Sequence, residues 1–564
     1  MIHVNQKGCS RSSGIRAVYQ SDSSGSLKEA GLVDAFTGIA AANFEISSME
    51  TVPGWKNRYF QKLSFSGPLE PGRYRISGMK DNGESEFSEN FTVSSELIAE
   101  KDLSDLLVYF KTMRSDGIYD EADRDVPVWE SNERRDASGG WYDASGDTSK
   151  YLSHLSYAER MNPQQTPLVV WILSDLIRRY DNAHLWAGDN FRRWVQFEMN
   201  HGADFLLKMQ HEEGWFYKIL FDQWSKDPEA RMLCSYKTQN GERLSTMKAG
   251  FREGGGMACA ALASAAVLSE GERKESYLKA AESGYSFLKE HNREVLEKGG
   301  ENLIDWYCAL SASLELYRAG RNEKYREDIS YWSRKILSAF HSFNDNEGWW
   351  FVIPEEKIPY YHASDEGLLI IAVKASLEFL EGQAKTDAEN MLNKALSFLA
   401  DSLLADPDPF YYPRHWVEGC EKAEYKWFYP HENPSGYWWQ GENSRISSLG
   451  AALLYGESDN SERLQQNSKL ALSVLDWQLG LNPFNVSMID GWGAGSPEYE
   501  GDYYNLPGGV ANGITSGFDD EKDIAFQPEL EGNPGDNSWR WGEQWIPHAA
   551  WFLMLSSLLR EKGL

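Results

Sequence analysis

The residues best suited to chemistry lie on one glycine-rich segment, Gly139-Gly-Trp-Tyr-Asp-Ala-Ser-Gly-Asp-Thr-Ser-Lys-Tyr151. Asp143 and Asp147 stand on it four residues apart, next to aromatic side chains. Two acids in one cleft push their pKa values apart, so that one stays ionised as a base while the other helps to hold water. The alternative is a helix N-cap followed by a turn aspartate. As an acid–base site, the segment would place Trp141 and Tyr142 against the substrate.

A third carboxylate, Glu543, stands near the end of the chain in Asn537-Ser-Trp-Arg-Trp-Gly-Glu-Gln-Trp-Ile-Pro-His-Ala-Ala-Trp551. An apolar aromatic setting raises the pKa of a carboxyl group, which suits a general acid. The dipole of the helix expected to begin here acts in the opposite direction, because it favours the ionised form. The alternative is a glutamate that simply serves this helix start.

A long polar and aromatic stretch supplies candidate contacts to a ligand. Trp438 and Trp439 offer flat faces on which sugar rings stack. The polar candidates in the same stretch are Arg414, His415, His431, Glu442 and Asn443. Each residue alone is as consistent with loop packing as with ligand contact. Long loops inside a compact domain are usually functional, so the stretch as a whole favours a binding loop.

Charge and composition narrow the class of ligand. The chain has 564 residues and a formal net charge of −29, which repels phosphate backbones and anionic membranes and attracts cations, including cationic sugars. We therefore expect no nucleic-acid partner. No apolar run is long enough to cross a bilayer, and the first residues lack the apolar core of a signal peptide, so we expect a cytoplasmic protein with no membrane partner. Nothing in the sequence indicates the oligomeric state.

We expect neither a metal nor a cofactor. The five cysteines are too scattered for a disulfide framework or for metal-ligand spacing. Asp519, Asp520 and Asp523 cluster beside Gly517, and carboxylates on a loop can hold calcium. Because they lack the alternating spacing of an EF-hand loop, a solvated acidic turn is the preferred interpretation.

The elements that position these residues fall into two regions. Residues 1–97 contain short strand-like runs separated by turn formers, which predicts a small β-sandwich. In residues 98–564 apolar side chains recur at helical spacing, and Thr386 begins a capping-box pattern. We expect helices near 103–114, 150–161, 167–181, 190–210, 254–269, 274–293, 303–317, 322–341, 364–380, 386–403, 443–456, 461–479 and 543–560. Helices in this number, with long loops at one end, suit an α/α toroid with an open cleft.

These segments resemble glycoside hydrolase family 9. The segment 139–151 resembles its Gly-Gly-(Trp/Tyr)-(Tyr/His)-Asp-Ala-Gly-Asp signature, and the segment of Glu543 resembles its terminal catalytic glutamate. Residues 252–263 match another family block, and Val4-Asn-Gln-Lys-Gly8 with Leu69-Glu-Pro-Gly-Arg-Tyr74 resembles the immunoglobulin-like module that precedes many of these domains. The resemblance implies a mainly α fold, an (α/α)6 barrel catalytic domain preceded by a small all-β immunoglobulin-like sandwich, and hydrolysis of β-1,4 glycosidic bonds with inversion.

The resemblance also implies roles for the three acids. Asp147 matches the general base, Asp143 the aspartate that orients the attacking water, and Glu543 the general acid. Inversion needs room for water between acid and base, so their carboxyl groups are expected to lie roughly 6.5–9.5 Å apart.

Two departures from the family pattern bear on the substrate. Ser145 is inserted in the signature, and residues 493–514 contain neither the histidines nor the arginine with which the family's cellulases contact sugar hydroxyls. The chain resembles an unsecreted subgroup of exo-β-D-glucosaminidases, which implies release of glucosamine from short imported chitosan oligosaccharides. The alternatives are a cello-oligosaccharide hydrolase resembling endoglucanases and a non-catalytic carbohydrate-binding protein.

Overall fold

The computed structural model describes residues 1–154, 161–235, 246–296, 300–419, 424–456, 461–497, 505–528 and 537–564. Its N-terminal region consists of two β-sheets that share an apolar core. The first sheet has the order β1 (Ile2–Val4), β3 (Ile15–Ser21), β7 (Tyr59–Phe65), β6 (Glu45–Ile46). The second has the order β2 (Gly8–Ser10), β10 (Phe91–Ser94), β8 (Gly72–Lys80), β4 (Leu27–Asp34), β5 (Ala40–Asn43), and β9 (Ser85–Phe87) pairs with β8.

Alternation of side chains along these strands builds the shared core. Ile2 and Val4 of the first sheet and Leu32 and Ile76 of the second are buried in the same cluster. The strand pairs are antiparallel apart from β2 and β10, which run parallel. The expectation of a strand-rich N-terminal region is therefore confirmed.

From residue 100 onward the described chain is mainly helical. Its fourteen helices are α1 (Glu100–Thr112), α2 (Gly117–Asp123), α3 (Thr166–Ala183), α4 (Asp189–Lys208), α5 (Gly256–Val267), α6 (Gly271–Val295), α7 (Leu303–Gly320), α8 (Glu323–Ser338), α9 (Leu368–Ser376), α10 (Gly382–Leu404), α11 (Asn443–Gly456), α12 (Ser461–Gln478), α13 (Trp539–Gly542) and α14 (Ile546–Glu561). None of these helices is long and apolar enough to cross a membrane.

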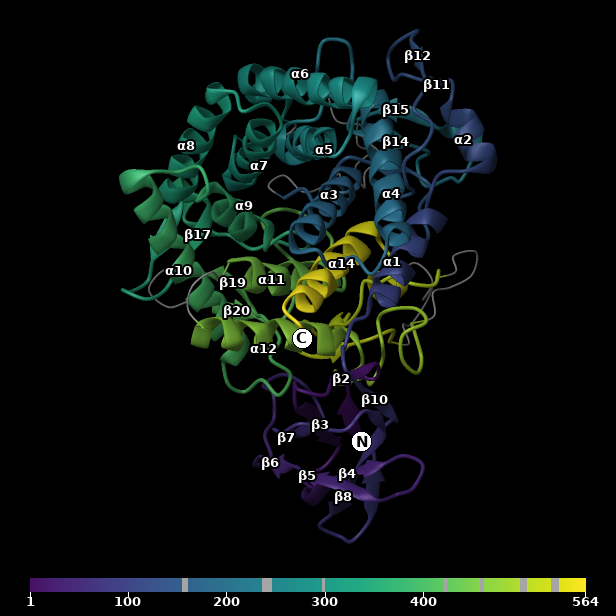
Figure 1. The fold of residues 1–564 in the computed structure, drawn as a ribbon, viewed down its shortest axis with the longest axis vertical. Helices are drawn as coiled ribbons and strands as arrows, with labels where there is room; N and C mark the ends of the chain where they lie inside the picture. Colours follow the sequence, from purple (N-terminus) through teal and green to yellow (C-terminus); the bar gives the residue numbers. More distant parts are fainter. Residues whose placement is uncertain are drawn as a thin grey trace.

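Six of the helices form a closed inner ring. In the order α3, α5, α7, α9, α11, α14, each contacts the next, and α14 contacts α3. The helices between them in sequence, α4, α6, α8, α10 and α12, pack on the outside, and α1 packs against α14 and α4. Figure 1 shows this ring above the strand-rich region. The inner helices are buried on nearly all sides, which explains why α5 and α7 are apolar around most of their circumference.

The N-terminal ends of the inner helices meet at one end of the ring. Hydrogen bonds join residues at or just before these ends: Gln164 to Arg252 and Asp365, Arg252 to Asp305, Ser364 to Ser444, and Ser444 to His548. The partial positive charge of each helix dipole therefore points to this end, where it favours nearby negative groups.

Most predicted helices are present, but two predictions are wrong. The segment predicted as a helix over 150–161 begins as β13 (Lys150–Tyr151), which pairs with β14 (Ile219–Phe221), and residues 155–160 lie outside the described chain. The helix expected to begin at Thr386 begins at Gly382, so the capping-box pattern lies inside α10. Tertiary pairing decided the first case, because a strand partner about 70 residues away is invisible in a local pattern.

The acidic turn at 519–523 joins the two regions. Asp520 Oδ2 lies 2.6 Å from Lys56 Nζ, and Asp523 Oδ1 lies 3.5 Å from Arg58 Nη1, both cations belonging to the strand-rich region. The described residues contain no cluster of acids, histidines or cysteines able to hold a metal ion. The turn is thus partly exposed to solvent, as expected, and it also forms ion pairs with the strand-rich region.

Candidate active site

The loop that carries Asp143 and Asp147 is shaped by its glycines. Gly140 has a φ of +74°, and a Cβ atom there would lie 2.7 Å from the ring of Phe205. No other residue type fits this position, because the left-handed conformation and the close approach both require glycine. Beyond it, Asp143 N–H donates to Ser149 O at 3.0 Å and Asp147 N–H donates to Ala144 O at 3.2 Å, which closes a tight turn.

The same loop is hydrogen-bonded to the segment of Glu543. Ser145 N–H donates to Gln544 O at 2.8 Å, and Ile546 N–H donates to Asp143 O at 3.1 Å. Gln544 N–H in turn donates to the hydroxyl of Ser145 at 3.1 Å. Segments about 400 residues apart in sequence are thereby held side by side at the N-terminal end of α14. Ser145, the residue inserted in the signature, makes two of these three contacts.

Asp143 is a buried carboxyl group with an aromatic partner. Its Oδ1 accepts the indole N–H of Trp545 at 2.8 Å. Burial raises the pKa of Asp143 well above its usual range, the charges of Asp147 and Glu543 raise it further, and the Trp545 hydrogen bond acts against them. His154 Nε2 lies 3.9 Å from Oδ2, but burial lowers the pKa of His154 to about 3, so this contact is not an ion pair at neutral pH.

Asp147 is also buried, but its carboxylate accepts more hydrogen bonds from the protein than that of Asp143. Its carboxylate accepts the backbone N–H of Ser149 at 2.8 Å and the hydroxyl of Tyr151 at 2.9 Å. Burial and the charge of Asp222 raise the pKa of Asp147 to about 6, while these hydrogen bonds limit the rise. Of the two aspartates, Asp147 is therefore the one that ionises more readily.

Glu543 lies between α13 and α14, and its side chain is partly exposed. Its backbone is fixed on both sides, since its N–H donates to Trp539 O at 3.4 Å and its carbonyl accepts from Asn512 N–H at 2.7 Å. The charge of Glu543 contributes to raising the pKa of Asp143 and of the buried Tyr437. The structure therefore brings all three predicted acids into one electrostatic neighbourhood.

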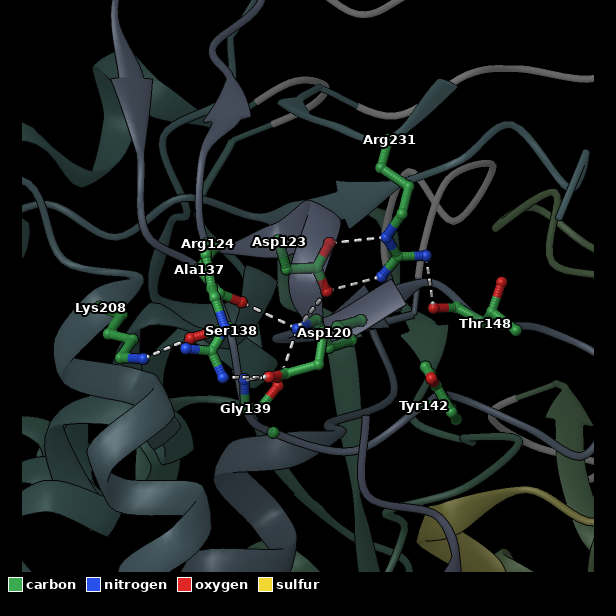
Figure 2. Close-up of polar contacts among 12 residues, drawn as sticks. Asp120, Asp123, Arg124, Ala137, Ser138, Gly139, Tyr142, Thr148, Lys208 and Arg231 are labelled. Atoms are coloured by element: carbon green, nitrogen blue, oxygen red, sulfur yellow. Dashed lines mark hydrogen bonds and ion pairs between the residues drawn. The ribbon is translucent and has the colours of Figure 1, made fainter. Parts of the chain in front are cut away.

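A buried ionic cluster is hydrogen-bonded to the backbone of the loop that carries Asp143 and Asp147. Asp123 receives two hydrogen bonds from Arg231, at 2.6 and 2.9 Å, and Arg231 also donates to the carbonyl of Thr148 at 2.9 Å (Figure 2). The ammonium of Lys150 lies 2.7 Å from Asp123 and donates to the carbonyls of Ala137 and Gly139 at 2.8 and 2.7 Å. Two buried cations thus hold loop carbonyls on both sides of the acids.

The sequence model of glycosyl hydrolase family 9 matches residues 101–500. This chain belongs to glycosyl hydrolase family 9. It is therefore a glycosidase, and Glu543 lies beyond the matched residues. None of the curated proteins compared with the chain matches it.

Solved structures share the fold of this family 9 hydrolase at low sequence identity. A Bacteroides ovatus GH9 protein has a TM-score of 0.67 at 18% identity, over 100% of this chain and 99% of its own. A metagenome-derived glycoside hydrolase family 9 endoglucanase has a TM-score of 0.67 at 18% identity, over 99% and 98% of the two chains. A single mutant of a thermostable endoglucanase from Alicyclobacillus acidocaldarius has a TM-score of 0.63 at 16% identity, over 99% of each chain.

Of the predicted sugar contacts in the hydrolase, Trp438 lies in a row of partly exposed tryptophans. Its ring centroid is 6.4 Å from that of Trp224 and 5.7 Å from that of Trp539. Trp224 follows Asp222 and is 43% exposed, and Trp539 lies in α13, just before Glu543. The row therefore extends from the neighbourhood of Asp147 to that of Glu543.

Four other predicted contacts, Trp141, His415, Glu442 and Asn443, are buried in this structure. Trp141 is 0% exposed, and its indole N–H donates to Glu198 at 3.3 Å. Glu442 lies 2.7 Å from His415 Nε2 and 2.6 Å from Arg445 Nε, and it also accepts the backbone N–H of Tyr429. Asn443 donates its amide to Ala511 O at 2.8 Å. Buried polar groups need partners, and these side chains have found theirs inside the protein.

Two further predicted contacts, Arg414 and Trp439, are engaged in local packing. Arg414 donates to the carbonyls of Ala405 and Pro407 and covers the ring of Trp427, so the structure gives it a loop-bracing role. Trp439 is 8% exposed, with His431 stacked on it at a centroid distance of 3.9 Å and Arg540 over it at 4.1 Å. A ring covered in this way offers little surface to a sugar.

Tyr142 and His431 are partly exposed, but their polar atoms are occupied. The hydroxyl of Tyr142 accepts from the backbone N–H of Asp116 at 3.1 Å, and His431 Nε2 lies 2.8 Å from the hydroxyl of Ser516. Both polar groups are thus hydrogen-bonded within the protein.

Sequence reasoning missed several residues of the site. Tyr151 ends the glycine-rich segment and His154 lies just after it. Only the proximity of Tyr151 to Asp147 and of His154 to Asp143 could have singled them out. Asp222 and Trp224 lie on a turn in which Gln223, Trp224 and Lys226 all have φ between +56° and +61°. Such left-handed residues cost roughly 1–3 kcal/mol each and concentrate at functional sites, but they leave no mark in a sequence.

Proposed function

We propose that this family 9 hydrolase is an inverting glycosidase in which Asp147 is the general base, Asp143 orients the attacking water and Glu543 is the general acid. The ring of six inner helices with outer helices between them supports an (α/α)6 barrel over residues 98–564, and the two sheets support an immunoglobulin-like sandwich over residues 1–97. The observation that carries the mechanism is the hydrogen-bonded pairing of the Asp143–Asp147 loop with the Glu543 segment.

In this mechanism the electrostatics divide the work between the acids. Ionised Asp147 removes a proton from water as the water oxygen attacks the anomeric carbon, and Glu543 donates a proton to the departing glycosidic oxygen as the C–O bond breaks. Asp143, whose pKa lies well above the usual range because of burial and the charge of Asp147, holds the water in place. No lysine or arginine of the described chain forms an ion pair with Asp143 or Asp147.

The stereochemistry of the product tests inversion. A β-linked substrate should release its new reducing end as the α-anomer, which proton NMR detects before mutarotation. Release of the β-anomer would contradict the assigned roles, because it requires a nucleophile about 5 Å from the acid instead of a water between acid and base.

We further propose that the substrate is a short β-1,4-linked glucosamine oligosaccharide, attacked at its non-reducing end. Asp143, Asp147 and Glu543 gather at the site, and the chain carries a net charge of −29. A protonated 2-amino group finds partners among such carboxylates, whereas a neutral glucose unit gains nothing from their charge. The histidine and arginine contacts of the family's cellulases have no counterpart in residues 493–514.

A direct comparison of substrates tests this proposal. The purified protein should release glucosamine from the glucosamine dimer with a kcat/KM at least tenfold above that for cellobiose. Equal or faster turnover of cellobiose would reject the amino-sugar proposal and leave the glycosidase assignment in place. It would favour the second candidate, a cello-oligosaccharide hydrolase, which is suggested by the solved relatives described as endoglucanases.

Glu543→Gln separates catalysis from mere sugar binding. We expect this substitution to lower kcat by roughly 10²–10⁴-fold on substrates with poor leaving groups, because a general acid contributes about that much. Glu561→Gln, at the opposite end of α14, is the matched control and should retain full activity. Saccharide binding without hydrolysis by the unmodified protein would instead support a non-catalytic binding protein.

A further inference from the structure

One buried acid outside the proposed triad touches the loop of the base. Asp222, at the end of β14, is fully buried. Its carboxylate accepts the hydroxyl of Thr148 at 2.7 Å, the hydroxyl of Ser149 at 3.1 Å and the backbone N–H of Trp224 at 2.9 Å. Thr148 and Ser149 are the two residues that follow Asp147 directly, so Asp222 fixes the chain at the point where the base is attached.

The neighbouring cations compensate Asp222 only in part. Arg231 Nη1 lies 3.9 Å from Asp222 Oδ2, but its shorter contacts go to Asp123 and to the carbonyl of Thr148. The ammonium of Lys150 is directed to Asp123 and to loop carbonyls. The structure thus uses both of these buried cations for Asp123 and the loop backbone, while the charge of Asp222 acts on Asp147.

The groups that face Asp147 come from several elements. Asp143 lies on the same loop, Tyr151 on β13 donates a hydrogen bond, and Asp222 approaches from β14. Glu543 precedes α14, and its charge acts on Asp143. Arg231 precedes β15 (Met232–Cys234), and its Nη1 lies 3.9 Å from Asp222 Oδ2, so it acts on Asp147 through Asp222. Among the charges that raise the pKa of Asp147, that of Asp222 is the largest.

We propose that Asp222 is a positioning residue for the catalytic base: it anchors the hydroxyls beside Asp147 and keeps that carboxylate a strong proton acceptor through its negative charge. The inference rests on the proposed function. An ordinary aspartate is too weak a base to accept a proton from water efficiently near neutral pH, and Brønsted behaviour favours a base whose pKa approaches the working pH.

The experiment compares the pH dependence of kcat/KM for the full-length protein, on a substrate that has no titrating group in the acidic range. Asp222→Asn should move the acidic limb to lower pH by roughly 1 unit, because removal of one nearby like charge has about that effect. The plateau rate should fall several-fold, since the base is weaker. Asp222→Glu retains the charge and should keep the limb near its original pH even though its plateau is lower.

Further variants keep the inference testable if Asp222→Asn does not fold. Thr148→Val with Ser149→Ala cuts both hydroxyl contacts without removing any charge, and it should lower kcat with little change in KM. An acidic limb that stays in place in a folded Asp222→Asn protein, or full kcat in the double variant, would overturn the inference. Asp147→Asn tests the proposed function itself. If this variant retains turnover, Asp147 is not the base, whatever the role of Asp222.

Discussion

At the residue scale, the two aspartates of the loop lie in an environment that disfavours their ionised form. Both are buried, both have raised pKa values, and neither is paired with a cation within the described chain. A protein seldom retains such an arrangement for stability, because buried charges without counter-ions weaken the folded state. Sites that tune proton transfer commonly show this feature.

The sign of this effect leads to a prediction for Asp147. A carboxyl pKa that rises from 3.8 to about 6 on folding means that the folded state binds more protons, so stability decreases as pH rises through that window. We expect Asp147→Asn to abolish hydrolysis and to raise the free energy of unfolding at neutral pH by about 1–3 kcal/mol. The gain should vanish below pH 4, where the native aspartate is protonated. Urea unfolding at both pH values measures it, and a variant less stable at neutral pH would contradict the argument.

Two adjacent tryptophans give a second prediction at this scale. Trp438 lies in the exposed row, whereas Trp439 is packed against His431 and Arg540. We expect Trp438→Ala to lower kcat/KM about 2–10-fold, the worth of one aromatic contact, without a change in thermal midpoint. Trp439→Ala should cost about 3–5 kcal/mol of stability, as for other buried aromatic side chains. Steady-state kinetics and thermal unfolding of both variants separate the roles, and a reversed pattern would show that the assignments are exchanged.

At the element scale, the start of α11 depends on a buried ionic network. Glu442, at the position before the helix, binds His415 and Arg445, and Arg445 also pairs with Glu366 at 2.9 Å. Burial opposes ionisation of Glu442, but the charges of His415 and Arg445 outweigh it and lower the pKa of Glu442 to about 2. The network fixes the loop before α11 against the rest of the ring.

Glu442→Gln should therefore act on stability. Loss of one partner from a buried ion pair costs about 3–5 kcal/mol, and we expect that loss at neutral pH. The lowered pKa means that the contribution of Glu442 is complete above its ordinary pKa of 4.5 and disappears as pH falls toward 2, so the difference between variant and parent should shrink in acid. Glu432→Gln, a neighbour in the same loop, is the control. Equal midpoints for both variants at neutral pH would disprove the structural role.

At the scale of the whole molecule, an aromatic contact joins the strand-rich region to the helical ring. Trp55 is 4% exposed, and its ring centroid is 4.8 Å from that of Trp427 and 6.4 Å from that of Phe410. The adjacent Lys56 forms its ion pair with Asp520 largely in solvent. Exposed ion pairs contribute little, so the apolar contact should dominate the attachment of the two regions.

Substitutions at these neighbouring positions test that ranking. We expect Trp55→Ala to lower stability by about 3–5 kcal/mol, whereas Lys56→Ala should leave the thermal midpoint unchanged. Chelator treatment should also leave it unchanged, because the acidic turn is occupied by Lys56 and Arg58. A midpoint that drops on chelation, or that rises with added calcium, would show that the turn binds metal.

Prediction from sequence succeeded where the determining interactions are local. Helical periodicity located the inner helices from α3 to α14, and alternation located the strands of the N-terminal region. It failed at Lys150–Tyr151, where pairing with β14 overrides the local pattern. It could not show that Glu442 and Trp141, predicted as ligand contacts, have buried partners inside the protein. The acids at 143, 147 and 543 were selected by type and setting, and their catalytic roles remain proposals.

The sequence alone determined which residues were available: an acidic chain, a glycine-rich loop with two aspartates, and a late glutamate among tryptophans. Residue type and local spacing are sufficient for that, because they reflect short-range sterics and hydrogen bonding. Only the tertiary structure decided that Ser145 bonds to Gln544, that Asp222 stands beside Asp147, and that Trp224 joins Trp438. Those contacts join segments tens to hundreds of residues apart, and closure of the helical ring is what brings them together.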